Sequence, residues 1–158
     1  MINRGLQPLL FLGEIMERIL ALDVGDKTVG LAISDELQII VTTLNTIFRT
    51  SKLEDRDKLK EIIDQYGVKT LVVGLPKNMD GSLGPQAKKV KKYMDFMKKN
   101  LDDIEVVYVD ERLTTVSATR VLIDTNVRRE NRKKYVDSIA ANYILRTYLD
   151  MQRGKNGE

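Results

Sequence analysis

A chain of 158 residues, 42% of them hydrophobic, has the size of one domain and enough apolar content to bury a core. It contains neither cysteine nor histidine, which excludes disulfides, thiolate nucleophiles, imidazole bases and metal sites built from these side chains. The formal net charge is only +3, so the distribution of charge along the chain is more informative than its sum.

Basic residues concentrate in two segments. Lys77 to Lys99 holds seven lysines against two acids, and Arg112 to Lys134 holds seven basic residues against two acids. Such zones suit a polyanion such as nucleic acid, and they also suit ordinary solvated helix faces.

The chain shows no targeting or membrane signal. No apolar run approaches the length of a membrane span, and the N-terminal PLLFL stretch is too short for the core of a secretory signal. We therefore expect a cytoplasmic protein with no membrane partner. Met16 lies right before the first predicted strand, and we expect translation to begin there. The expected organisation is a non-native or disordered extension over residues 1–15, one domain over 16–152 and a disordered tail over 153–158.

Three strands are expected at the start of the domain. Apolar runs predict strands over about Arg18–Val24 and Thr28–Ser34, and Gly25 allows a tight turn between them. β-Branched residues predict a third strand over Ile39–Phe48. Asp23 lies within the first apolar run, where a charge is costly unless something pairs with it. The alternative is an aspartate that only stabilises the turn after the strand.

Two helices and a fourth strand follow. Ser51 and Glu54 form a capping box that opens a helix, and Gly67 ends it. A short buried strand over Thr70–Val73 stops at a loop rich in glycine, proline and asparagine, Gly74–Pro85. The next helix is expected to turn its lysines outward and pack a methionine-containing face into the core; its inward residues are Ala87, Val90, Met94 and Met97.

The last third of the chain supplies two further acids. A fifth strand over Ile104–Val109 runs into Asp110 and Glu111, and alternation puts Glu111 on the side of Val109. A short helix is expected from Thr114 or Thr115 to near Ile123, followed by a polar, mobile segment over Asp124–Arg132.

A final helix is expected over about Lys133–Met151. On it, Asp137 shares an inward face with Ala140 and Ala141, and those small side chains would let the helix approach the sheet closely. The alternative for Asp137 is a first-turn acid favoured by the helix dipole.

The order of elements predicts an α/β fold. Three meandering strands followed by alternating strands and helices give a mixed sheet with helices on both faces. Asp23, Glu111 and Asp137 then come from three separate elements and point toward the sheet or its rim. Clustered carboxylates repel one another, so such a cluster needs a cation or raised pKa values. Without histidine or cysteine, the expected cation is Mg²⁺ or Mn²⁺, and two such ions would suit phosphoryl transfer on a phosphodiester.

Four strings carry a resemblance to a known family: LALDVGDKTVGLAISD, GLPKNMDGSLGPQA, VDERLTTVSA and VDSIAANYIL. In this order and spacing they resemble the signatures of the YqgF family, also called Holliday-junction-resolvase-like proteins or pre-16S rRNA nucleases. The resemblance covers Met16 to about Tyr148. It implies an RNase H-like fold, with a five-stranded mixed sheet of strand order 3-2-1-4-5 and helices on both faces. It also implies that Asp23, Glu111 and Asp137 are the catalytic, metal-binding triad.

The chain departs from the family pattern at one point, because Lys27 is followed by Thr28 where the family usually carries a basic pair. Further contacts to the substrate backbone are hypotheses, each with a solvated surface charge as its alternative. The candidates near the carboxylates are Lys27, Lys77, Asn78 and Arg112; those expected to clamp a strand from a mobile loop are Arg128, Arg129, Arg132, Lys133 and Lys134.

The resemblance implies a nuclease and leaves two substrates open. One is the 5′ end of precursor 16S rRNA, which we favour, and the other is a four-way DNA junction. Junction cleavage would need a symmetric dimer, and the sequence shows no obvious dimer face, so we expect a monomer or weak homodimer. A nucleic-acid-binding protein with weak or no catalysis is a further alternative. A member of the actin-like and sugar-kinase class is another, although that class needs two such domains.

Overall fold

The computed structural model describes residues 16–113 and 129–156, and within the second range it describes side chains from Ser138 to Lys155. Its strands are β1 (Ile19–Val24), β2 (Thr28–Ser34), β3 (Val41–Phe48), β4 (Thr70–Leu75) and β5 (Glu105–Asp110). Its helices are α2 (Lys52–Tyr66), α3 (Pro85–Asn100), the 3₁₀ turn η2 (Glu111–Leu113) and α5 (Arg129–Asn156).

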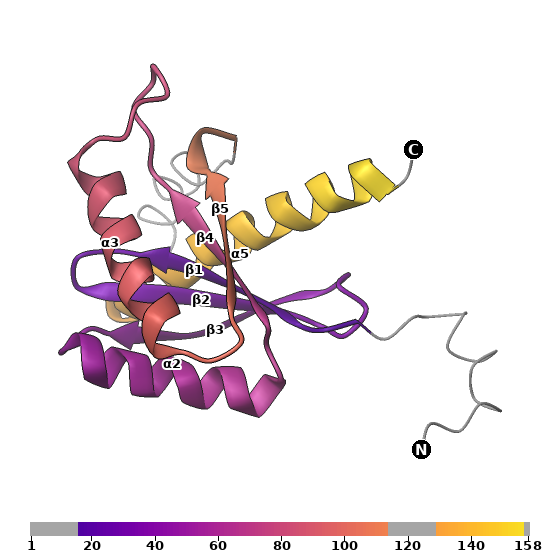
Figure 1. Cartoon of the computed structure of the whole chain (residues 1–158), viewed down its shortest axis with the longest axis horizontal. Coiled ribbons are helices and arrows are strands. Elements are labelled where there is room, and N and C mark those ends of the chain that lie inside the picture. The colour runs from indigo at the N-terminus through magenta and orange to yellow at the C-terminus, as the bar shows by residue number, and fades with distance from the viewer. Residues whose placement is uncertain (1–15, 114–128, 157–158) are drawn as a thin grey trace, which may run out of the picture.

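The five strands form one mixed sheet of order β3-β2-β1-β4-β5. The first three strands are antiparallel neighbours, while β4 is parallel to both β1 and β5. Helices α2 and α3 cover one face of the sheet, and α5 crosses the other (Figure 1). The predicted α/β class, strand order and RNase H-like arrangement are therefore confirmed.

The signals at the ends of α2 act as predicted. The hydroxyl of Ser51 accepts a hydrogen bond from the backbone N–H of Glu54 at 3.2 Å. The carboxylate of Glu54 accepts its own bond from the hydroxyl of Thr50, so only half of the reciprocal capping box is present. Gly67 ends the helix in the left-handed conformation, with φ of 66°.

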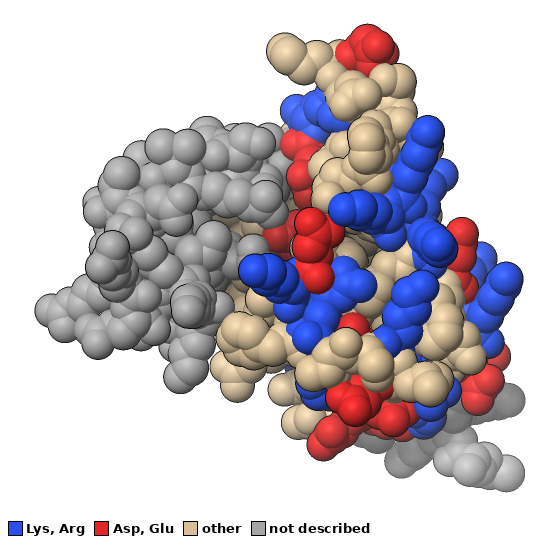
Figure 2. Space-filling view, turned by 90° about the vertical axis from the view of Figure 1, so that its left-hand side faces the viewer, with Lys and Arg blue, Asp and Glu red and all other residues tan. Residues whose placement is uncertain are grey.

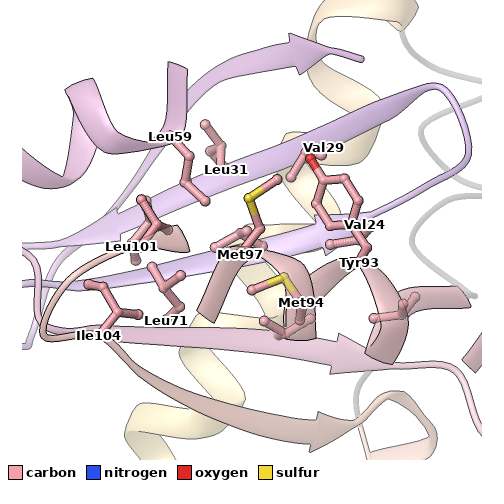
Figure 3. Close-up of a cluster of buried hydrophobic side chains, with 14 of the residues drawn as sticks. Val24, Val29, Leu31, Leu59, Leu71, Tyr93, Met94, Met97, Leu101 and Ile104 are labelled. Atoms are coloured by element: carbon pink, nitrogen blue, oxygen red, sulfur yellow. The ribbon is translucent and has the colours of Figure 1, made fainter. Parts of the chain in front are cut away.

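The methionine-bearing face of α3 lies in the core, as predicted. Met94 and Met97 are buried, and they pack with Leu71 of β4 and Leu59 of α2 (Figure 3). These residues belong to the larger of two apolar clusters, which fills the space between the sheet and helices α2 and α3. The smaller cluster lies under α5.

Strand β3 starts two residues later than predicted. The carboxylate of Asp35 accepts hydrogen bonds from the N–H groups of Ile39 and Ile40, at 2.7 and 2.9 Å, and this holds both residues in the connection before the strand. Their side chains are each 62% exposed. The β-branched pattern was right for the strand and wrong for its first two residues, because a side-chain carboxylate competes for their backbone N–H groups.

Helix α5 is longer than predicted at both ends. It begins at Arg129, so residues 129–132 are helical and the prediction of a mobile segment there is wrong. It also continues through Arg153–Asn156, which were expected in a disordered tail. The expected short helix near residues 114–123 lies outside the described residues, as does the extension over 1–15. No helix within the described parts of the chain is both long and apolar enough to cross a membrane.

Candidate functional site

Asp23 is a buried carboxylate near the carboxyl end of the central strand β1. Alternation along the strand places it on the α5 side of the sheet, with Ile19 and Ala21, and only 5% of it is exposed. Its neighbour across the antiparallel pair is Gly30, at an irregularity in the β2–β3 register. A carboxylate this deeply buried must be paired or bound to a cation to remain charged.

Glu111 reaches the same side of the sheet from the turn after β5. An ideal Cβ on Gly74 of β4 would lie 2.8 Å from Oε1 of Glu111 and 2.5 Å from Cδ1 of Ile144 on α5. Real Cβ atoms do not approach other atoms this closely, so the missing side chain at Gly74 is what lets Glu111 and α5 meet over β4.

Asp23 and Glu111 line one pocket of about 220 Å³, together with Gly25, Asp26, Pro76 and Gln86. The structure thus brings together two of the three predicted acids, from elements almost ninety residues apart. Asp26 is a further carboxylate at this pocket that the sequence analysis did not select. Its side chain is 63% exposed and lies 3.7 Å from Nζ of Lys89, so it belongs to the rim.

Asp137 lies in α5, and its side chain is outside the described part of the structure. The next residue, Ser138, anchors this part of the helix to the sheet. Its buried hydroxyl lies 2.7 Å from the hydroxyl of Thr46 on β3 and accepts a bond from the N–H of Leu31 on β2 at 3.3 Å. Ser138 was missed because one buried serine gives no periodic signal.

The donor set fits a hard divalent cation. Both described acids at the pocket offer carboxylate oxygens, and the chain has no softer histidine or cysteine ligand. Within the ranges 16–113 and 138–155, no three carboxylates lie close enough to form a complete metal site. The side chain of Asp137, the predicted third ligand, lies outside the described part.

Arg112 holds the protein's own loops together. Its guanidinium donates to both carboxylate oxygens of Asp110, at 2.6 to 3.1 Å, and to the carbonyl of Met79 at 3.1 Å. These bonds lower the pKa of Asp110 and tie the end of β5 to the loop that precedes α3. A substrate that binds Arg112 would therefore compete with Asp110 and Met79 for the guanidinium.

Asn78 likewise stabilises the loop before α3. Its side-chain amide donates to the hydroxyl of Ser82 at 3.0 Å, and its backbone N–H donates to the carbonyl of the same residue at 2.9 Å. An ideal Cβ on Gly84 would lie 2.8 Å from Oδ1 of Asn78, so a larger residue there would displace the Asn78 side chain.

The remaining predicted contacts occupy several places. Lys27 is exposed in the turn between β1 and β2, and Lys77 is half-buried just after β4. Arg129, Arg132, Lys133 and Lys134 lie in the first turns of α5, with side chains outside the described part, and Arg128 is outside the described residues altogether.

The sequence matches a known protein family and named relatives. Residues 17–151 match the model of a family described as RuvX, Holliday junction resolvase. A protein of Clostridium botulinum (strain Hall) named "Putative pre-16S rRNA nuclease" is 51% identical over 133 residues, covering 84% of this chain and 96% of the relative. A protein of the same name from Halothermothrix orenii is 46% identical, covering 89% of this chain and 99% of the relative.

Two solved structures share the fold at low sequence identity. RuvC of Thermus thermophilus, in complex with a Holliday junction substrate, superposes with a TM-score of 0.55 at 11% identity, covering 85% of this chain and 96% of that one. The Holliday junction resolvase of fowlpox virus gives a TM-score of 0.50 at 14% identity, covering 85% and 99% of the two chains.

Proposed function

The chain belongs to the RuvX family of Holliday-junction-resolvase-like proteins, and from this membership we propose that it is a metal-dependent nuclease that hydrolyses phosphodiester bonds. The observation that carries the proposal is the pocket that buried Asp23 and half-buried Glu111 both line, beyond the carboxyl ends of β1 and β5. A protein that only bound phosphates would gain nothing from two carboxylates at that place.

Each acid has a distinct role in this proposal. Asp23, on the central strand, would bridge two Mg²⁺ or Mn²⁺ ions, while Glu111 and Asp137 would each hold one. Bound there, the ions would supply a water activated for attack on phosphorus and stabilise the leaving oxygen. In the hydrolysis, a P–O bond forms to the water oxygen as the P–O bond to the leaving oxygen breaks, and that oxygen takes up a proton.

The chain's own residues shape the site around the carboxylates. Gly74 leaves room for the side chain of Glu111, and Arg112 fixes the loop that borders the pocket. Lys27, exposed on the turn beside the pocket, remains a candidate contact to the substrate backbone.

For the substrate we propose the 5′ end of precursor 16S rRNA, on the strength of the names carried by relatives that are 46% and 51% identical along nearly their whole length. The protein would then act in the cytoplasm in ribosome biogenesis, as a monomer or weak homodimer. A four-way DNA junction is the second candidate, favoured by the description of the family.

The proposal is tested by comparing wild type with Asp23→Asn on labelled precursor 16S rRNA and on a four-way DNA junction. Each substrate is incubated with Mg²⁺, with Mn²⁺ and with chelator. We expect cleavage of the rRNA that chelator abolishes and that Asp23→Asn lowers by at least about 100-fold, because the change removes a direct metal ligand. Asp64→Asn, an exposed change on α2, is the matched control and should cleave as wild type does.

A second measurement separates metal loss from misfolding. Mg²⁺ or Mn²⁺ should raise the thermal unfolding temperature of wild type and leave that of Asp23→Asn unchanged, since only a bound cation stabilises the folded state. Cleavage of the DNA junction alone would move the assignment to the second candidate. Equal activity of wild type and Asp23→Asn would exclude the metal-nuclease proposal.

A further inference from the structure

A second pocket lies on the opposite side of the turn between β1 and β2. It has a volume of about 240 Å³, and its charged lining residues are Asp26, Arg49, Lys52, Lys89 and Lys92. We call this pocket the lysine cleft. The lysines come from two helices: Lys52 begins α2, and Lys89 and Lys92 lie in the first half of α3. Lys89 and Lys92 lie in the basic segment noted in the sequence, but no residue of this pocket was selected individually, because only packing of the helices gathers them.

Arg49 forms a fixed wall of the lysine cleft. Its Nη1 donates to the carbonyl of Gly25 at 2.5 Å, and its Nε lies 3.6 Å from Oδ2 of the buried Asp55. The guanidinium also stacks 4.2 Å from the ring centroid of Tyr93. The negative charge of Asp55 balances the positive charge of Arg49. Arg49 therefore contributes mainly to the shape of the cleft and little to its net charge.

The three lysines give the cleft its positive charge. Lys89 lies 3.7 Å from Asp26, but both side chains are more than 60% exposed, so this ion pair is weak and readily exchanged. Lys52 lies 5.7 Å from the ring of Phe96, a contact that leaves its charge uncompensated. The lining therefore carries three lysines against a single exposed aspartate, an arrangement that attracts an anion.

The lysine cleft adjoins the pocket that Asp23 and Glu111 line, which we call the carboxylate pocket. Both are lined by Val24, Gly25, Asp26 and Gln86, so they lie on the two sides of one turn. Lys and Arg side chains spread over this face of the molecule, with Asp and Glu between them (Figure 2). A chain of phosphates that crosses the turn would thus meet the lysines on one side and the carboxylates on the other.

We propose that the lysine cleft binds the phosphate backbone of the nucleic-acid strand next to the segment held at Asp23 and Glu111. The inference rests on the proposed function, and it adds the direction in which the strand leaves the site: over the β1–β2 turn and between the N-terminal halves of α2 and α3. Lys52, Lys89 and Lys92 would supply the contacts, and Arg49 is a positioning residue.

The test uses the triple variant Lys52→Gln/Lys89→Gln/Lys92→Gln. Its control, Lys69→Gln/Lys98→Gln/Lys99→Gln, removes the same charge from exposed lysines at the other end of α3 and before β4. Binding of a fluorescein-labelled single-stranded RNA is followed by anisotropy at several salt concentrations, with EDTA so that cleavage does not interfere. Thermal unfolding of each variant confirms that it is folded.

We expect the cleft variant to bind at least tenfold more weakly at low salt, and the slope of log K against log salt to shrink by up to about 2, at about 0.7 for each phosphate neutralised. The control should change the slope by less than one such contact. Equal losses in the two variants would mean that only overall charge matters, and would overturn the proposal.

A mononucleotide could offer the same phosphate chemistry, so a competition with AMP is the second arm. Binding of AMP to wild type but not to the cleft variant, without displacement of the RNA, would assign the cleft to a mononucleotide and overturn the strand path. Because binding is measured without divalent cations, failure of Asp23→Asn to affect cleavage would reject the nuclease proposal and leave the comparison of the two triple variants valid.

Discussion

The two faces of the sheet are built from side chains of different size. Beneath α2 and α3 the buried residues are mostly leucine, isoleucine, valine and methionine. Beneath α5, alanines occupy four of the ten buried positions: Ala21, Ala32, Ala140 and Ala141. On that side Gly74 also has no side chain where Ile144 and Glu111 approach.

This difference in side-chain size suggests that one face of the sheet mainly stabilises the fold and that the other mainly forms the site. Large apolar side chains bury more surface, so the face under α2 and α3 contributes more of the hydrophobic stabilisation. Small residues let α5 lie close to the strands and leave space for carboxylates at their carboxyl ends. Changes on the first face should therefore lower stability, and changes on the second should lower activity.

The largest effect on stability is expected for Met97→Ala. Met97 is fully buried, and removing its side chain should lower the free energy of unfolding by about 2–5 kcal/mol, by lost burial and a residual cavity. Urea unfolding measures the change, with Met79→Ala as control because Met79 is 98% exposed. Cleavage per folded molecule should not change, and a loss of cleavage in the folded variant would contradict the separation of the two faces.

Gly74→Ala probes the other face. The new methyl group would meet Ile144 and Glu111, so we expect a loss of about 1–3 kcal/mol of stability and a fall in cleavage as Glu111 is displaced. Gly154→Ala is the matched control: it lies in α5 with nothing within 4 Å of an added Cβ, and should gain up to about 1 kcal/mol from helix propensity. Full cleavage activity in Gly74→Ala would contradict the role given to this glycine.

Tyr93→Phe should have a smaller effect, confined to stability. The hydroxyl of Tyr93 donates to Oδ2 of buried Asp55 at 3.1 Å, and its loss should cost about 1–2 kcal/mol in urea unfolding at neutral pH. Leu53→Ala, an exposed change on α2, is the control. If Tyr93→Phe left the free energy of unfolding unchanged, Arg49 and the N–H of Thr50 would be sufficient partners for the carboxylate of Asp55.

The same tyrosine predicts how stability depends on alkaline pH. Burial and the neighbouring Asp55 raise the pKa of Tyr93 above its ordinary value of 10.0. Above pH 10 the unfolded chain therefore releases this proton while the folded protein retains it, and the free energy of unfolding falls as pH rises. Burial also raises the pKa of Tyr108 and Tyr148, so Tyr93→Phe should make this decline shallower without removing it. Identical slopes in the two proteins would contradict the prediction.

Local signals predicted most of the fold correctly. The apolar runs of the first two strands, the cap at Ser51 and the glycine stop at Gly67 depend on neighbours a few residues away, and each has the predicted structure. The prediction failed where a local competitor was overlooked, as when Asp35 binds the N–H groups of Ile39 and Ile40. It also failed at the start of α5. A polar, charged segment can be helical when a later part of the same helix packs against the sheet.

By itself, then, the sequence determined the order of the strands and helices, their inward faces, and the acids at the ends of β1 and β5. These follow from side-chain periodicity and turn chemistry, which act over a few residues. The family resemblance had already grouped Asp23 with Glu111, whereas only the tertiary structure decided that Lys52 shares a pocket with Lys89. The tertiary structure also assigned Arg112 and Asn78 to loop contacts, because a polar side chain bonds to whichever partner packing brings within reach.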